Sequence, residues 1–305
     1  MVTQDQWEQI ACLTEPGARL LRSVELKGGV SAQVTMLEIE QADGSMKKLV
    51  VRQHGAADRT RNQNIARDEY KLLQGLTEAG LPVPQAYAYG DSGGGSAVPY
   101  IVTDFVEGQV ELAPRDVHDA MHQLANVLTD IHQADWKRRS LVFLPEQTDW
   151  CSAKLENRPA EPDESLCESR IREVLESAWP LRQANRDVLL HGDFWPGNVL
   201  WSQGRIAAVI DWEDAALGDP LFDLANARLE ILWAYGKEAM EEFTQHYISR
   251  NPQTDFSGLS HWDLFAALKP ASGLSDWGLE PETEQNMRQR HRWFTDQAFA
   301  RIEAR

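Results

Sequence analysis

The sequence has few cysteines, no long apolar run and no surplus of basic residues, and each absence excludes a class of protein. Its 305 residues include three cysteines and no Cys-x-x-Cys pair, so neither a cysteine zinc site nor a disulfide framework is indicated. No apolar stretch approaches the length that crosses a membrane, and the first residues, MVTQDQWEQIACL, lack the pattern of a secretory signal. We therefore expect a reduced, cytoplasmic protein with no membrane partner.

Acidic residues outnumber basic ones, which gives a formal net charge of −17. A field of this sign repels the phosphates of nucleic acids and anionic lipids, so no nucleic-acid partner is expected. The same charge either favours cationic small molecules or serves solubility alone. The composition is that of an ordinary globular protein. A chain of this length has room for two lobes, each with its own core.

The pattern changes near Glu107-Gly108, where we expect a boundary between two lobes. Residues 1–107 contain short strand patterns and a two-residue hairpin signal at Asp43-Gly44, whereas residues 108–305 have mainly helical spacing. We expect an α+β protein with an antiparallel sheet and one main helix in its first lobe and a larger helical second lobe. The expected elements of the first lobe are a helix over residues 1–22, strands at Val24–Leu26, Val34–Glu40, Lys48–Arg52 and Val98–Val106, and a helix over residues 62–79.

A short apolar strand at Val188–Leu190 leads into His191-Gly192-Asp193, and Asn198 follows five residues after the aspartate. This is the Asp-to-Asn spacing of the catalytic loop of protein kinases, H-R-D-x-x-x-x-N, although Gly192 here replaces the arginine. In phosphoryl transfer such an aspartate orients the attacking hydroxyl and accepts its proton.

The two short strands expected after Asn198 indicate a possible metal site. If Gly204-Arg205 is the two-residue loop between them, Asn198 lies opposite Asp211, about 5 Å away on the same face of the hairpin. An amide oxygen and a carboxylate at that separation can share Mg²⁺, which prefers oxygen ligands.

A helix is expected to begin at Gly218-Asp219-Pro220, with Asp219 as its N-cap and Pro220 in its first position. Asp223 falls in the first turn of this helix. Its carboxylate either interacts with the helix dipole alone or reaches back to brace the catalytic loop.

HGDFWPGNVLW followed by VIDWEDAALGDPLFDLA resembles the aminoglycoside phosphotransferase and choline kinase family, which has a bilobal protein-kinase-like fold. The resemblance runs over most of the chain. It implies that Asp193 is the catalytic base and that Asn198 and Asp211 are the metal ligands. It also implies that His191 helps to order the catalytic loop.

The resemblance extends to nucleotide-binding residues in the first lobe. Arg52, in KKLVVRQ, stands where the family has a Lys or Arg that meets the phosphates, and Glu69, in ARDEYKLL, stands where a helix supplies its ion-pairing partner. A glycine-containing loop would cover the phosphates, and a strand with its hinge would pack against the adenine. These two segments contribute Gly28, Gly29 and Ser31, and Asp104, Phe105 and Val106.

We therefore expect a small-molecule kinase that uses ATP or GTP with Mg²⁺ and phosphorylates a hydroxyl of a small, cationic acceptor, such as an amino sugar or an amino alcohol. Residues 1–107 would bind the nucleotide, and residues 108–305 would carry the catalytic loop, the metal ligands and the acceptor-binding helices. Three alternatives stay open: a housekeeping kinase for a non-antibiotic metabolite, a nucleotide-binding module without turnover, and a metal-dependent hydrolase. The sequence assigns neither the acceptor nor the oligomeric state.

Overall fold

The computed structural model describes residues 4–26, 32–91, 98–138 and 140–304, and the chain divides into two compact units. Neither unit is one continuous segment, although the longest segment of the first unit ends close to the predicted boundary at Glu107-Gly108. The assignment of nucleotide binding to the first lobe and acceptor binding to the second stays a prediction. The first unit comprises Met1–Gln109, Asp135–Phe143 and Ile206–Glu213, and the second comprises Val110–Ala134, Leu144–Arg205 and Asp214–Arg305.

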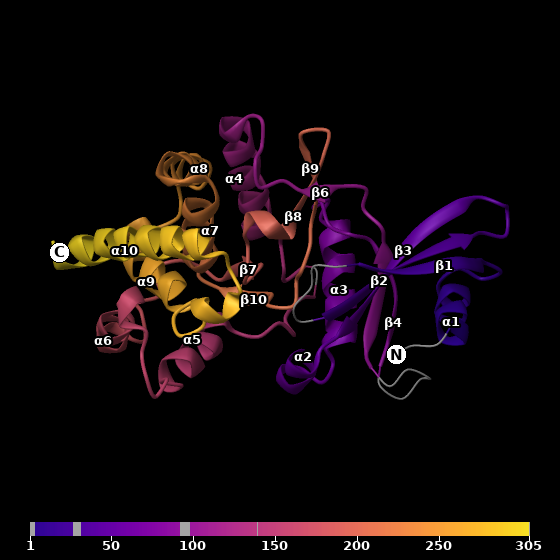
Figure 1. Ribbon diagram of the computed structural model, residues 1–305, viewed down its shortest axis with the longest axis horizontal. Helices are drawn as coiled ribbons and strands as arrows, with labels where there is room; N and C mark the ends of the chain where they lie inside the picture. Colours follow the sequence, from indigo (N-terminus) through magenta and orange to yellow (C-terminus); the bar gives the residue numbers. More distant parts are fainter. Residues whose placement is uncertain (1–3, 27–31, 92–97, 139, 305) are drawn as a thin grey trace. The chain divides into compact units, whose positions relative to one another are not determined.

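A five-stranded sheet with the order β1-β2-β3-β5-β4 is the main feature of the first unit (Figure 1). Every pair of neighbouring strands in it is antiparallel, as the sequence predicts. The elements of this unit are α1 (Gln4–Thr14), β1 (Arg19–Leu26), β2 (Ala32–Glu40), β3 (Met46–His54), α2 (Ala56–Arg61), α3 (Ile65–Glu78), β4 (Ala86–Gly90) and β5 (Tyr100–Asp104).

Alternate residues of β3 face opposite sides of the sheet. Leu49 and Val51 are fully buried in an apolar cluster that includes Trp7 of α1. Arg52 follows Val51 and therefore points to the other face, where it donates a hydrogen bond to Glu69 of α3. The two helices thus cover opposite faces of the sheet, and Arg52 meets Glu69 on the face under α3.

The hairpin between β2 and β3 forms where the sequence predicts it, but its loop is longer by one residue. The N–H of Gln41 donates to the carbonyl of Ser45, which leaves residues 42–44 as the loop. Gly44 has a φ of 82°, the left-handed conformation that closes a three-residue hairpin loop.

Several expected boundaries in the first unit are wrong, because the strands start about two to five residues before or after the predicted positions. The helix predicted over residues 1–22 ends at Thr14, because Pro16-Gly17 interrupts it and Gly17 takes a φ of 83°; the strand β1 then begins at Arg19. The strand expected to run to Val106 ends two residues earlier, with β5. The helix expected over residues 62–79 is present as α3.

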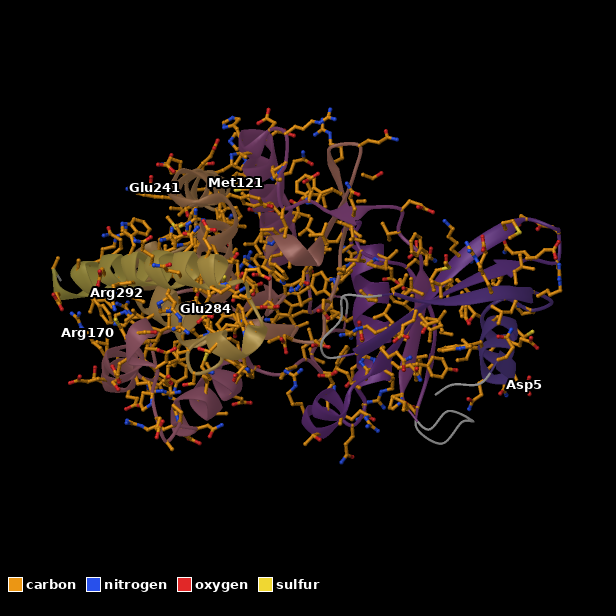
Figure 2. All side chains as sticks on the ribbon, in the orientation of Figure 1. Asp5, Met121, Arg170, Glu241, Glu284 and Arg292 are labelled. Atoms are coloured by element: carbon orange, nitrogen blue, oxygen red, sulfur yellow. The ribbon has the colours of Figure 1, made fainter. Side chains whose placement is uncertain are left out.

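The second unit is mainly helical, with α7 and α9 buried along most of their lengths. The helix α7 packs against α8, α9 and α10, and α4 packs against α8. Figure 2 labels Met121 of α4, which is fully buried, and Glu241 of α8, which is exposed. The helices are α4 (Val117–Gln133), α5 (Gln147–Glu156), α6 (Glu168–Ala178), α7 (Pro220–Tyr235), α8 (Lys237–Arg250), α9 (Leu259–Leu268) and α10 (Pro281–Glu303).

Short strands lie on either side of the segment that carries the kinase-like spacing. The strand β7 (Val188–Leu190) pairs antiparallel with β10 (Ala216–Gly218), with Leu189 opposite Leu217. The remaining short strands are β6 (Gln109–Val110), β8 (Val199–Ser202) and β9 (Arg205–Val209). Within the described parts of the chain, each helix is either too short or too polar to cross a bilayer.

The turn between β8 and β9 corrects the expected register. Its two residues are Gln203 and Gly204, with φ values of 51° and 74°, the left-handed pair that a type I′ turn requires. The loop is therefore not Gly204-Arg205. The strand register that set Asn198 opposite Asp211 is wrong, because it depended on that loop.

Candidate active site

One buried carboxylate fixes the start of the loop that follows β7. Asp223, in the first turn of α7, accepts the N–H of His191 on one oxygen at 2.7 Å and the N–H of Gly192 on the other at 2.9 Å. Asp219 caps the same helix through its side chain, and Pro220 occupies its first position, as the sequence predicts. Of the two roles considered for Asp223, the structure supports the brace.

Two further helices hold Asp223 in place. His132, in the last turn of α4, has its Nε2 atom 3.2 Å from Asp223 Oδ2 and its Nδ1 atom 2.6 Å from the hydroxyl of Tyr247 on α8. Burial alone would raise the pKa of Asp223, but the contacts with His132 and His191 outweigh it and hold the pKa below its ordinary value. Asp223 is therefore an ionised group in the interior of the second unit.

Asp193 is held by a lysine that the sequence did not single out. Lys269, the residue after α9, donates to Asp193 Oδ1 at 3.0 Å, to the carbonyl of Gly192 at 3.1 Å and to Asn226 Oδ1 at 2.8 Å. Burial alone would lower the pKa of Lys269, but the charge of Asp193 and the hydrogen bond to it raise the pKa above its ordinary value. Lys269 is thus a charged ammonium placed against the predicted base.

Asn198 ends a short 3-10 turn, η2 (Pro196–Asn198), and closes the loop onto Asp193. Its Nδ2 donates to the backbone carbonyl of Asp193 at 2.9 Å and lies 3.4 Å from Asp193 Oδ2. Only the nitrogen of an amide can donate to a carbonyl, so the Asn198 oxygen is the atom left to accept. The ring of His191 is buried, and its Nδ1 accepts the N–H of Asp193 at 3.3 Å.

A second carboxyl group lies near Asp193. Glu230 belongs to α7, and burial raises its pKa to about 8, with the charge of Asp193 adding to the shift and that of Lys269 opposing it. The Glu230 carboxyl therefore carries a proton at neutral pH. No sequence pattern pointed to Glu230, because it lies within a largely buried helix.

In the first unit a single guanidinium holds three carboxylates. Arg52 donates to Glu69 at 3.2 Å, to Asp211 at 2.8 Å and to Glu213, and its own side chain is only 13% exposed. The side chain of Asp211 is 38% exposed, against 6% for Glu69 and 12% for Glu213. Asp211 is therefore the carboxylate of this cluster that a cation from solvent can reach.

The pKa values of this cluster follow from its burial. Burial opposes the charge of Arg52, but its three carboxylate partners outweigh that effect and raise its pKa. Burial also raises the pKa values of Glu69 and Glu213, with Arg52 opposing the rise. Burial and the charge of Arg52 lower the pKa of His54 to about 4, so His54 is neutral at pH 7.

The remaining predicted residues lie at the end of β5 or outside the described chain. Asp104 accepts the N–H of Gln85 at 2.7 Å, and the N–H of Phe105 donates to the carbonyl of Lys48 at 3.2 Å. The Lys48 ammonium lies 5.1 Å from the centre of the Phe105 ring, and Val106 is partly buried. The residues of the expected glycine-containing loop, Gly28, Gly29 and Ser31, fall outside the described residues.

A family model described as "Phosphotransferase enzyme family" matches residues 24–262. The chain belongs to this family. The matched residues include the Arg52 cluster and the loop around Asp193. The resemblance drawn from the motifs is confirmed.

Curated relatives of this chain match it over parts of their own length. Acyl-CoA dehydrogenase family member 10 of Mus musculus is 26% identical over 200 residues, which are 60% of this chain and 18% of the mouse protein. Hygromycin-B 4-O-kinase of Escherichia coli is 40% identical over 65 residues, which are 21% of this chain and 18% of that kinase. The chain thus spans less than a fifth of either relative.

Solved structures with the same architecture match nearly the whole of this chain. The amicoumacin kinase hAmiN, in complex with AMP-PNP, Ca²⁺ and Ami, matches with a TM-score of 0.65 at 15% identity, over 97% of this chain and 94% of its own. A thermostable mutant of aminoglycoside phosphotransferase APH(4)-Ia, in ternary complex with ADP and hygromycin B, matches with a TM-score of 0.62 at 18% identity, over 97% of each chain. These likenesses confirm the predicted α+β, protein-kinase-like fold.

Gly192 is expected to tolerate no side chain. Its φ is 85°, and a Cβ atom would lie 2.0 Å from the backbone oxygen of Asp214. We expect Gly192→Ala to lower the free energy of unfolding by well over the roughly 1–2 kcal/mol that a left-handed backbone alone costs a non-glycine residue. Gly204→Ala is the matched control, since its φ is 74° but no described atom lies within 4 Å of the added Cβ. Equal losses in denaturant unfolding of the two variants would contradict the steric account.

The raised pKa of Glu230 predicts a pH-dependent stability. Its folded pKa, about 8, exceeds its ordinary value of 4.5, so the unfolded chain loses the proton first and the folded state is destabilised as the pH rises between those values. Glu230→Gln removes this ionisation. We expect the unfolding free energy of the variant, relative to the wild type, to increase from pH 5 to about pH 8 and then to level off. A difference that stays constant from pH 5 to pH 9 would refute the assignment.

Proposed function

We propose that this phosphotransferase is a small-molecule kinase that transfers the γ-phosphate of ATP or GTP to a hydroxyl of a small, cationic acceptor. The observation that carries the proposal is the hydrogen-bonded loop around Asp193. Lys269 holds one oxygen of this carboxylate, and Asn198 closes the loop on its backbone carbonyl. A carboxylate oriented in this way is the group that phosphoryl transfer to a hydroxyl requires.

Asp193 is the proposed base. Lys269 and the Asp193 Oδ1 atom form an ion pair, which orients Oδ2 for a proton from the acceptor. As Oδ2 takes that proton, the acceptor oxygen forms a bond to the γ-phosphorus, and the bond from the γ-phosphorus to the bridging oxygen of the diphosphate breaks. The products are a phosphate ester and a nucleoside diphosphate. His191, buried and bonded to the N–H of Asp193, is the proposed positioning residue of the loop.

Asn198 and Asp211 are the proposed Mg²⁺ ligands, and their chemistry fits the ion. Asn198 supplies its amide oxygen, because its amide nitrogen is the atom that donates to the carbonyl of Asp193. Asp211 supplies the most exposed carboxylate of the Arg52 cluster. Hard divalent cations take such oxygen ligands, and Mg²⁺ when bound would neutralise phosphate charge. AMP-PNP with Ca²⁺ in the complex of the amicoumacin kinase supports a nucleotide with a divalent ion as cofactors.

Arg52 and Glu69 are the proposed nucleotide-binding ion pair. The guanidinium is held at three carboxylates, so its planar fork is oriented before any phosphate arrives. The proposal extends the family pattern to the rest of the predicted nucleotide site. Those residues are Gly28, Gly29, Ser31, Asp104, Phe105 and Val106.

A cationic acceptor is favoured by the acidic character of the chain. The net charge of −17 attracts cations to the molecule as a whole. Relatives named as a hygromycin-B kinase and an amicoumacin kinase support a small-molecule acceptor.

A panel of hydroxyl compounds with ATP and with GTP tests the function, by measuring the release of nucleoside diphosphate. We expect cationic compounds to stimulate the release. Stimulation only by neutral or anionic compounds would remove the cationic acceptor from the proposal, and release without any acceptor dependence would indicate a hydrolase. For a positive acceptor, resistance conferred on a sensitive host separates an antibiotic kinase from a metabolite kinase, which would instead rescue a metabolic lesion.

Asp193→Ala should abolish transfer while nucleotide binding persists. Removal of a positioned base lowers kcat by roughly 10²–10⁴-fold, and the Arg52 cluster that is proposed to meet the nucleotide is unchanged in this variant. The readouts are acceptor-stimulated turnover and the Kd of the nucleotide. Asp296→Ala, which removes an exposed carboxylate of α10, is the control and should leave both unchanged. Full turnover by Asp193→Ala would show that Asp193 is not the base.

A further inference from the structure

Two pairs of side chains face each other on α4 and α8, far along the chain from the proposed catalytic residues. His118 and His122 are four residues apart on α4, and Glu242 and His246 are four residues apart on α8. Residues at this spacing share one face of a helix. The two helices pack side by side, so the pairs meet (Figure 1).

Three of these side chains converge on one point. Glu242 Oε1 contacts His118 Nδ1 and lies 3.4 Å from His122 Nε2, and the three atoms all lie within 4.8 Å of one another. A tetrahedral Zn²⁺ with bonds of about 2.0–2.2 Å separates its ligand atoms by roughly 3.5 Å. The three side chains can therefore reach one ion with small rotations about their own bonds.

The fourth side chain orients the second ligand. The ring of His246 stacks on that of His122, with ring centres 4.1 Å apart and planes at 14°. His246 Nε2 in turn lies 3.0 Å from Asn126 Oδ1, one helical turn beyond His122 on α4. The His246 ring, itself held by this contact with Asn126, therefore packs on one face of the His122 ring and limits its rotation.

The donor set selects the class of ion. Two imidazoles and one carboxylate suit Zn²⁺ and other first-row transition metals, whereas Mg²⁺ prefers oxygen ligands alone. The side chain of His118 is 66% exposed and that of His122 is 36% exposed, so an ion can enter from solvent and keep a water ligand.

We propose that His118, His122 and Glu242 bind one divalent transition-metal ion, represented by Zn²⁺, and that this ion clips α4 to α8. The same two helices supply His132 and Tyr247, which hold the carboxylate under the 191–192 backbone. An ion at the cluster would therefore stabilise the helix pair that supports the proposed catalytic loop.

Titration of the purified full chain with ZnCl₂ tests the site. The sample for this titration should be prepared without an affinity tag and freed of metal with a chelator. Excess Mg²⁺ is then added to occupy the proposed Mg²⁺ site at Asn198 and Asp211. We expect one Zn²⁺ per chain. Changes to residues that hydrogen-bond a metal's ligands already cost about 10–100-fold in affinity. Loss of two ligands in the double variant His118→Ala with His122→Ala should therefore raise the Kd for Zn²⁺ at least that much.

Thermal unfolding gives an independent readout, since an ion that binds only the folded chain raises the unfolding temperature. Zn²⁺ should raise it for the wild type and for His261→Ala, a histidine change on α9 outside the cluster, but not for the double variant. Glu242→Gln, which keeps its size, provides a second test if the double variant folds poorly, and its Zn²⁺ affinity should also fall. Equal Zn²⁺ affinity of the wild type and Glu242→Gln, or the absence of stoichiometric binding by the wild type, would overturn the proposal.

Discussion

The two hydrogen bonds from the backbone of His191 and Gly192 to the Asp223 carboxylate are the interaction on which the rest of the second unit's site depends. A buried carboxylate is stable only when donors satisfy its oxygens. Here both oxygens accept a backbone N–H, and His132 approaches one of them from α4. The loop cannot move away from α7 without leaving an ionised group unsatisfied, so its geometry is set before any substrate binds.

The same constraint limits the movement of Asp193, the proposed base. The loop turns sharply at Gly192, where the backbone is left-handed and a side chain would collide with the backbone of Asp214. Lys269 then bridges the carbonyl of Gly192 and the carboxylate of Asp193, and Asn198 closes the loop on the carbonyl of Asp193. The turn at Gly192, the Lys269 ammonium and the Asn198 amide together leave the Asp193 carboxylate little freedom to rotate.

In the first unit, the positions of three carboxylates are set by their ion pairs with one cation, the Arg52 guanidinium. A guanidinium presents several donors in one plane, so Arg52 can meet Glu69, Asp211 and Glu213 at once, which a single ammonium point charge would do less well. This gives a physical reason for Arg at a position where the resemblance to the family implies either Lys or Arg. The most exposed carboxylate of the cluster, Asp211, is the proposed metal ligand.

Much of the fold could be predicted from local patterns, because those patterns reflect local physics. The antiparallel sheet, the helix α3 and the cap at Asp219-Pro220 follow from alternation, helical spacing and capping chemistry. The turn at Gln203-Gly204 could not be placed, because Gly fits the second position of one hairpin turn and the first of another, and only the backbone of Gln203 decides between them. Lys269 could not be found either, because it reaches Asp193 across 76 residues of sequence through packing of α9. The roles of the site residues stay predictions carried by the family motifs.

The most direct test of the central claim is the turnover of Asp223→Asn. An amide has one acceptor oxygen where the carboxylate has two, so the N–H of His191 or of Gly192 would face an NH₂ donor, and the loop would lose its brace with almost no change in volume. The account predicts a folded variant whose kcat falls by at least about tenfold, the loss that one buried hydrogen bond of roughly 1.5–3 kcal/mol to a charged group implies, with the Kd of the nucleotide unchanged. A kcat equal to that of the wild type would contradict it.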